Sequence, residues 1–173
     1  MTHTWLASAL FVIAMTARSP DARPERWVLN TFTLSGVAVE IAIEQTPGVH
    51  TAVTATFTPM DAAFHLYSKD LPKTGIRGIG RPTLLELLPS RSVKSAGPLT
   101  ADKPSTDLLI PTLGLSFPTY PRGAVTLRLP VRTMKSSAEA DVSVTYMACS
   151  EERCLNPVIG HRVAIKVPNG LVR

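Results

Sequence analysis

The sequence predicts an all-β fold, an immunoglobulin-like antiparallel β-sandwich, and three observations lead to this prediction. Short segments rich in Val, Thr and Ile alternate between apolar and polar residues, which is the period of a half-buried strand. Fifteen prolines and ten glycines punctuate the chain of 173 residues. No segment carries the apolar spacing of a helix. About seven short strands separated by such turn residues are typical of a two-sheet sandwich.

The individual strands follow from the alternation. It is clearest over residues 51–58, where Val, Ala and Phe fall on one face and threonines on the other. Residues 71–82 are rich in Gly and Pro and are expected to form turns. Residues 90–107 are polar, contain two prolines and are expected to form a long loop, which in a small domain is more often functional than idle. Further strands are expected at residues 36–44, 64–68, 83–88, 125–132, 141–146 and 163–167.

The N-terminus carries a short apolar segment. Residues 5–15 form an uncharged run that falls short of the roughly 20 residues of a membrane span but fits the hydrophobic region of a secretory signal. A buried first strand or helix is the alternative, because no Lys or Arg precedes the run. We expect residues 1–22 to be a signal peptide or hydrophobic leader and residues 23–173 to be one exported domain. An uncleaved leader would retain that domain at the membrane.

The charge pattern bears on the class of partner. The formal net charge is +5 and the isoelectric point is about 9.6, a balance that could suit an acidic partner. However, the basic residues are scattered, and no aromatic residues are interleaved with them. Proteins that bind single-stranded nucleic acid need both a basic track and stacking faces, so no nucleic-acid partner is expected. No motif points to a bound cofactor or to a serine hydrolase.

The chain contains two cysteines, Cys149 and Cys154, separated by four polar residues after a predicted strand. A turn of this length can bring two Cα atoms within the roughly 4.4–6.8 Å that a disulfide requires. Closing so short a loop would stabilise the fold by only about 2 kcal/mol, and a domain of this size does not depend on such a bond. A disulfide on an exposed turn is open to attack by a partner thiolate. The spacing therefore favours redox exchange over a structural role.

A metal site is the competing interpretation of the same residues. Cys149, Cys154 and His161 would supply two sulfurs and one nitrogen, and His50 or His65 could approach in space. Structural zinc sites ordinarily use four protein ligands, and no fourth ligand lies nearby in the sequence. No metal is therefore expected.

The residues around the cysteines resemble a known family. In residues 144–158 a strand ending Tyr-x-x-Cys is followed by a short turn and then Cys-Leu-Asn-Pro. This pattern resembles the N-terminal periplasmic domain of the thiol:disulfide interchange protein DsbD. Residues 64–69 resemble the aromatic strand beside that family's redox pair, and residues 120–131 resemble the strand before its cysteine hairpin. Together these similarities span residues from about 50 to 168.

The resemblance implies an immunoglobulin-like sandwich that relays electrons in the periplasm. Its partners would be thioredoxin-like protein domains and a membrane electron donor, in cytochrome c biogenesis or disulfide correction. Cys154 would form the mixed disulfides and Cys149 would be the resolving thiol, which would make the chain a component of a thiol:disulfide oxidoreductase. Four further residues would flank the pair: His65, Tyr67, Tyr146 and Pro157.

The sequence departs from the family in three respects. Asn156 stands where the family has a proline, and His65 stands where a tyrosine is common. The family's protective loop, with its acidic residues and Phe, has no clear match; residues 90–107 are the candidate for its place but contain no aromatic residue.

The alternative function is a non-catalytic, exported interaction module of the same fold, in which the disulfide only locks a loop.

Overall fold

The computed structural model describes residues 25–45, 51–134 and 138–168. These residues form thirteen β-strands and no helix, and every strand pair is antiparallel. The all-β prediction is therefore confirmed. Over the described ranges, no helix is long and apolar enough to cross a membrane. The expected leader, residues 1–22, lies outside the described residues.

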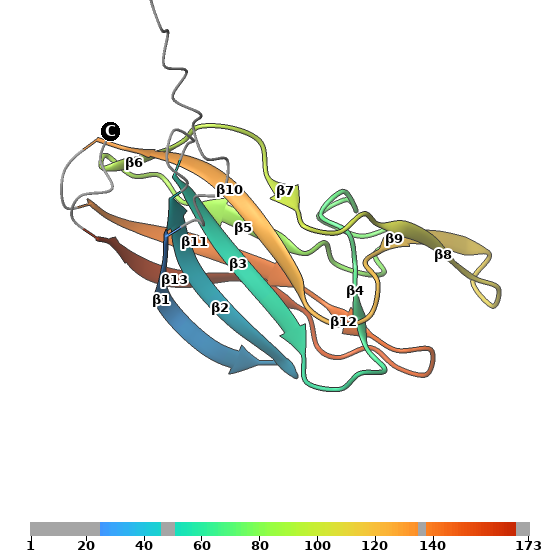
Figure 1. Ribbon diagram of the computed structural model, residues 1–173. Coiled ribbons are helices and arrows are strands. Elements are labelled where there is room, and N and C mark those ends of the chain that lie inside the picture. The colour runs from blue at the N-terminus through green and yellow to red at the C-terminus, as the bar shows by residue number, and fades with distance from the viewer. Residues whose placement is uncertain (1–24, 46–50, 135–137, 169–173) are drawn as a thin grey trace, which may run out of the picture.

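The larger sheet contains six strands in the order β1-β2-β3-β10-β6, with β7 also paired to β10 (Figure 1). Alternation along its central strands builds one side of the core: Val53, Ala55 and Phe57 are fully buried, as the sequence predicts. The bounds are β1 Glu25–Leu34, β2 Val37–Gln45, β3 Ala52–Pro59, β6 Val93–Ser95, β7 Thr100–Ala101 and β10 Val125–Thr133.

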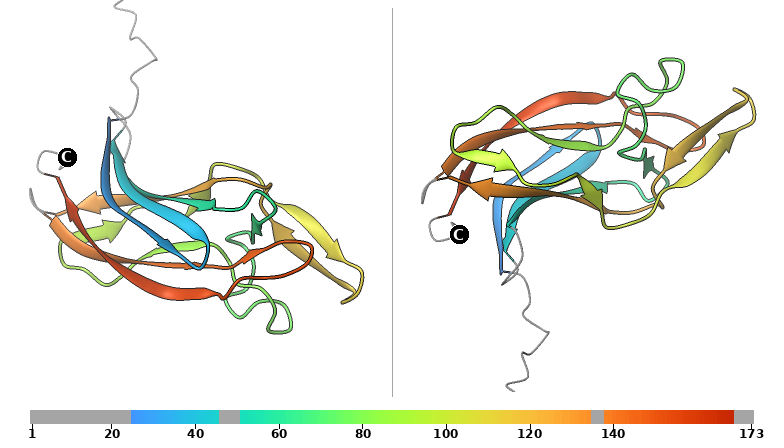
Figure 2. Two further views of the ribbon diagram at one scale, coloured as in Figure 1. Left: turned by 90° about the horizontal axis from the view of Figure 1, so that it is seen from below. Right: turned by 90° about the horizontal axis from the view of Figure 1, so that it is seen from above.

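The second sheet has three strands in the order β13-β11-β5 and packs against the first, as the two layers in Figure 2 show. Its bounds are β5 Leu84–Leu87, β11 Ala138–Tyr146 and β13 Val158–Val167. Buried valines of β11 face the larger sheet, and each contributes about 1.5–3 kcal/mol when fully removed from water. The rings of Phe57 and Tyr146 meet across the core with centroids 5.4 Å apart.

Two small ladders occupy one end of the sandwich. Strand β4 (His65–Leu66) pairs with β12 (Ala148–Cys149). Strands β8 (Thr106–Ile110) and β9 (Leu115–Thr119) form a hairpin that extends beyond the sandwich at the same end (Figure 1). A second hydrophobic cluster, separate from the main core, lies at this end and contains the buried residues Tyr67, Leu71, Phe117 and Cys149.

Three segments differ from the prediction. Residues 90–107 are not one long loop: they contain β6, β7 and the start of β8, and β6 and β7 pair with β10. Val93 is fully buried there, and Leu99 and Ala101 pack against the main core. The surrounding polar residues conceal these apolar residues in the sequence. Strand β1 and the β8–β9 hairpin were not predicted. The pairing of β1 is interrupted by a register shift between Val28 and Asn30, which breaks its alternation.

Candidate redox site

Cys149 and Cys154 form a disulfide at the end of β12. They are directly opposite each other, and the flanking hydrogen bonds run from the Leu155 amide to the Ala148 carbonyl and from the Ser150 amide to the Arg153 carbonyl. The cysteines are thus a non-hydrogen-bonded pair, the arrangement in which opposing Cα atoms lie closest. Their Cα atoms are 4.0 Å apart, slightly below the range expected from the sequence.

The four-residue turn between the cysteines is held by the side chain of Ser150. Its hydroxyl accepts hydrogen bonds from the amides of Glu152 and Arg153, each at 3.2 Å. Serine commonly stabilises turns in this way. The guanidinium of Arg153 lies 5.5 Å from the ring centroid of Phe64, which fixes the returning strand against the body of the domain. The turn therefore presents a defined surface around Cys154.

The two sulfurs lie in different environments. Cys149 is 2% exposed and belongs to the second hydrophobic cluster. Cys154 is exposed. A thiolate that approaches from solvent can therefore reach Cys154, whereas Cys149 is shielded by the packed end of the sandwich.

Tyr67 contacts the shielded sulfur. Its hydroxyl donates a hydrogen bond to Sγ of Cys149 across 3.3 Å, and the residue is 1% exposed. Burial raises the pKa of the Tyr67 hydroxyl above its ordinary value of 10, so the group keeps its proton. Its ring is held by Phe117, with centroids 5.6 Å apart. Tyr67 is therefore a fixed hydrogen-bond donor to Cys149.

His65 lies on the other side of Cys149 from Cys154. The β4–β12 register places it directly opposite Cys149, and its ring meets that of Tyr67 edge-on at 5.9 Å. Burial lowers the pKa of the His65 imidazole below 6.5; the charge of Arg122 lowers it further, and that of Glu151 opposes the shift. Arg122 and Glu151 form an ion pair 2.8 Å long.

The turn-rich segment 71–82 packs against the second hydrophobic cluster, which contains Cys149, a role that the sequence did not predict. Leu71 is buried in the cluster with Tyr67, and Ile76 and Ile79 pack against the same cluster. The two isoleucines are joined by a pair of backbone hydrogen bonds, each 3.0 Å long. The apolar residues interleaved among its glycines and prolines were the available signal. Residues 90–107, expected to take this place, instead supply strands to the sheets.

Two of the four expected flanking residues, Tyr146 and Pro157, are not among the residues of the second hydrophobic cluster. Tyr146 is fully buried in the main core, where its hydroxyl donates to the Leu34 carbonyl at 2.9 Å. Burial raises the pKa of this hydroxyl to about 12. Pro157 is exposed and immediately precedes β13. Only His65 and Tyr67 are brought together beside Cys149.

The residues considered for a metal site are dispersed. His161 is opposite Val144 in the β11–β13 ladder, and its ring lies 4.9 Å from that of Phe32. His50 lies outside the described residues. Within the part of the chain that the structure describes, no three His, Cys, Asp or Glu side chains are grouped so as to hold a metal ion.

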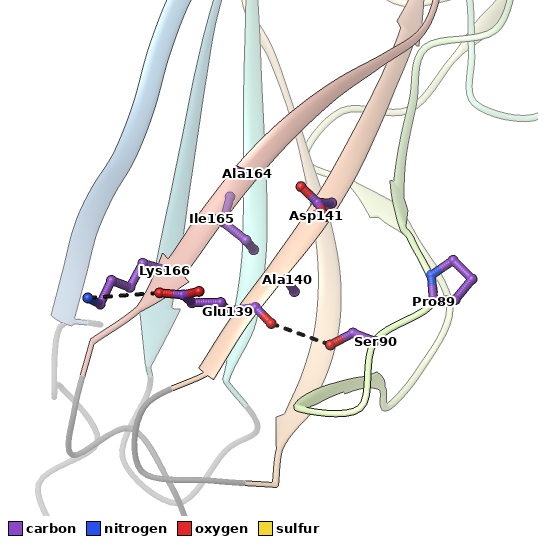
Figure 3. A pocket seen from close by; sticks show the side chains of 8 residues that line it. All are labelled: Pro89, Ser90, Glu139, Ala140, Asp141, Ala164, Ile165 and Lys166. Atoms are coloured by element: carbon purple, nitrogen blue, oxygen red, sulfur yellow. Dashed lines mark hydrogen bonds and ion pairs between the residues drawn. The ribbon is translucent and has the colours of Figure 1, made fainter.

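A separate hollow lies elsewhere, over the start of β11 and the end of β13 (Figure 3). It has a volume of about 420 Å³, and its lining includes Glu139, Asp141 and Lys166. Lys166 and Glu139 pair across it at 3.9 Å. Cys149 lies beyond the opposite end of β11, so this hollow takes no part in the chemistry of the disulfide.

Comparisons with known proteins address the fold. No protein-family model matches the chain, and no curated protein matches it. The N-terminal domain of DsbD from Neisseria meningitidis, in the reduced form, is similar with a TM-score of 0.44 and 15% identity over 69% of this chain and 78% of that one. The N-terminal periplasmic domain of ScsB from Proteus mirabilis is similar with a TM-score of 0.50 and 9% identity.

The ScsB alignment covers 83% of this chain and 53% of that one, so the chain spans about half the length of that neighbour. At these identities the likeness concerns the fold. The structural neighbours of this disulfide-bearing chain include the N-terminal domains of DsbD and ScsB, and the ScsB domain, with its TM-score of 0.50, confirms the predicted resemblance in fold. The two packed antiparallel sheets form the expected immunoglobulin-like antiparallel β-sandwich.

Proposed function

We propose that this chain is an exported thiol:disulfide exchange domain that relays electrons between thioredoxin-like proteins through Cys149 and Cys154. The observation that carries the proposal is the asymmetry of the disulfide. One sulfur, that of Cys154, is on an exposed turn, while the other is 2% exposed and hydrogen-bonded by Tyr67. A disulfide that only locks a loop does not require its two sulfurs to differ in exposure. An exchange reaction, in contrast, needs one sulfur to be attacked and the other to leave.

The reaction then proceeds in two steps. A thiolate of the partner attacks Sγ of Cys154, the bond to Cys149 breaks, and Cys149 leaves as a thiolate that takes up a proton. The second partner thiol loses its proton and attacks the partner sulfur of the mixed disulfide, which releases Cys154. Two electrons pass to the domain: its disulfide becomes two thiols, and the partner's two thiols become a disulfide. The same steps in reverse pass the electrons onward.

Tyr67 assists the step in which Cys149 leaves. A hydrogen bond to a charged group is worth about 1.5–3 kcal/mol, more than one to a neutral group. Because burial keeps the Tyr67 hydroxyl protonated, it stabilises the charge that develops on Cys149 more than it stabilises the disulfide. The hydroxyl therefore favours the transition state for exchange.

The location and partners extend the proposal. The ScsB neighbour is a periplasmic domain, which supports export of this chain as well. The DsbD-like cysteine motif supports thioredoxin-like partners, with a membrane protein as electron donor and cytochrome c biogenesis or disulfide correction as the setting. Residues 1–22 would then act as the signal peptide, or as a leader that keeps the domain at the membrane.

Equilibration of the folded, oxidised domain with reduced thioredoxin tests the proposal. Structural disulfides typically have reduction potentials below about −300 mV. We expect a higher potential here, so that free thiols form in the native domain at defined thioredoxin ratios. A bond that stays intact in the native domain, and is reduced only after unfolding in urea, would instead support the non-catalytic interaction module.

A further inference from the structure

His65 is placed to exchange a proton with the shielded cysteine. Directly opposed residues of an antiparallel pair lie on the same face, with Cβ atoms about 4.5–5.5 Å apart, and His65 is opposite Cys149. On its other side Cys149 is opposite Cys154. Cys149 therefore lies between His65 and the sulfur that meets the partner.

The contacts of Tyr67 place the His65 ring on this face. Tyr67 follows His65 by two residues and so shares its side of the strand. The two rings meet edge-on at 5.9 Å, and the Tyr67 hydroxyl reaches Sγ of Cys149. His65 also lines a cleft of about 190 Å³, together with Arg122 and Glu151. The imidazole thus shares a strand face with Cys149 and lines a hollow open to solvent.

Among the titratable groups around this cleft, only the imidazole suits a proton acceptor. Burial keeps the Tyr67 hydroxyl protonated, and the Tyr120 hydroxyl is buried and accepts a backbone hydrogen bond. The Glu151 carboxylate is exposed and paired with Arg122. His65, whose pKa is lowered by burial and by Arg122, is neutral near pH 7 and has a nitrogen lone pair available.

We propose that His65 is the proton acceptor for the Cys149 thiol when a partner disulfide reoxidises the reduced pair. This role rests on the exchange function proposed above. The Cys154 thiolate first attacks the partner disulfide, forming a mixed disulfide and expelling one partner sulfur as a thiolate. His65 then takes the proton of Cys149, whose sulfur attacks Sγ of Cys154 and expels the second partner sulfur.

The step balances without a further reactant. Cys149 and Cys154 together lose two electrons and become a disulfide, while the partner disulfide gains them and becomes two thiols. Two protons leave the cysteines and end on the partner sulfurs: the proton of Cys154 passes through solvent, and that of Cys149 passes through His65 and the cleft. In the opposite direction the imidazolium returns its proton to Cys149 as that sulfur leaves.

Stopped-flow oxidation of the reduced domain by dithiobis(nitrobenzoate) separates the two steps. Attack by Cys154 releases the first thionitrobenzoate at a rate proportional to reagent concentration. Attack by Cys149 on the resulting mixed disulfide releases the second at a rate independent of that concentration. Cys149→Ala identifies the first phase, because it lacks the second. His161→Gln, which changes a histidine opposite Val144 on the β11–β13 ladder, is the matched control.

We expect His65→Phe, which keeps a ring against Tyr67, to slow the second phase about 100-fold at pH 7 and to leave the first phase unchanged. The second-phase rate of the wild type and of His161→Gln should show an inflection below pH 6.5, and His65→Phe should lack it. Equal second-phase rates in wild type and His65→Phe, or a wild-type profile without this inflection, would overturn the role of His65.

If His65→Phe does not fold, the pH dependence of the second-phase rate of the wild type tests the role of His65 by itself. A wild type that releases only one thionitrobenzoate, as Cys149→Ala does, would contradict the exchange function itself, and the role of His65 with it. That result differs from a normal second phase that is indifferent to His65, which contradicts the proton acceptor alone.

Discussion

The hydroxyl of Tyr67 donates a hydrogen bond to Sγ of Cys149, 3.3 Å away, although 82 residues separate them in the sequence. Both residues are almost fully buried, while the second sulfur of the disulfide, that of Cys154, is exposed. In the proposed exchange reaction, this contact would distinguish the sulfur that leaves from the sulfur that is attacked.

Tyr67→Phe should slow reduction of the domain by reduced thioredoxin roughly tenfold. The variant keeps the ring but loses a donor to the leaving sulfur, and a loss of about 1.4 kcal/mol from the transition state is a factor of ten. Tyr146→Phe is the comparison, because it removes a buried hydroxyl that bonds to the Leu34 carbonyl. It should cost similar stability and leave the rate unchanged. Equal rates in wild type and Tyr67→Phe would refute the assistance by Tyr67.

Gly75→Ala should disturb segment 71–82, which packs against the cluster that contains Cys149. Gly75 has a φ of +76°, and a Cβ there would meet the Ile79 carbonyl oxygen at 2.1 Å. Gly78→Ala is the control, since its φ is +82° but its Cβ would meet nothing within 4 Å. The control should cost about 1–2 kcal/mol of backbone strain.

In urea unfolding, Gly75→Ala should lose clearly more stability than Gly78→Ala, because the main chain of residues 71–82 has to move. Thioredoxin should then reduce its disulfide more slowly, since Leu71, Ile76 and Ile79 no longer hold Tyr67, the hydrogen-bond donor to Cys149, as they do in the wild type. Equal losses of stability in Gly75→Ala and Gly78→Ala would show that the close approach to Ile79 does not constrain the segment.

Arg122→Gln should raise the pKa of His65. The guanidinium lowers that pKa by its charge, and the Glu151 carboxylate, which raises it, would lose its ion-pair partner. Titration of His65 followed by NMR would measure the shift of its pKa. Arg162→Gln is the control, because Arg162 pairs with Asp141 on the β11–β13 ladder. An unchanged His65 titration in Arg122→Gln would contradict this electrostatic account.

The stability of the domain should depend on His65 at mildly acidic pH. Burial lowers the pKa of the folded imidazole below 6.5, so between the two values the unfolded chain binds more protons than the folded one. The free energy of unfolding therefore falls as the pH drops from about 6.5 towards the folded pKa. Between pH 7.5 and 5.5, the free energy of unfolding in urea should fall more for the wild type than for His65→Phe. An identical fall in both proteins would show that charging His65 does not destabilise the folded domain.

Local pattern predicted the central strands and the position of the disulfide. The alternation of β3 and β10 is strict because one face of each lies on the core, and the cysteine spacing alone places Cys149 and Cys154 within bonding reach. Strand β1 was missed because it is at the edge of its sheet and carries a register shift. The β8–β9 hairpin was missed because its exposed Leu108 and Leu109 do not alternate with polar residues.

The composition of the site depends on contacts that sequence pattern does not contain. The family resemblance identified His65 and Tyr67 as neighbours of the disulfide, but the same reasoning also included Tyr146, whose side chain points into the main core. The direction of the chain after residue 146 decides whether a side chain reaches the disulfide or enters the main core. The position of residues 71–82 depends on long-range packing against the cluster that contains Tyr67, so glycine and proline content predicted the turns but not the residues that they contact.

Trapping of the mixed disulfide tests the central claim, that Cys154 is attacked and Cys149 leaves. Single variants Cys149→Ala and Cys154→Ala would each be mixed with a thioredoxin that lacks its own resolving cysteine. The remaining thiol of that thioredoxin would first be converted to a mixed disulfide with thionitrobenzoate. Non-reducing electrophoresis and mass spectrometry would then measure the covalent complex. We predict a complex through Cys154 in Cys149→Ala and little or none in Cys154→Ala, because its remaining sulfur is buried. Equal yields from both variants would contradict the account.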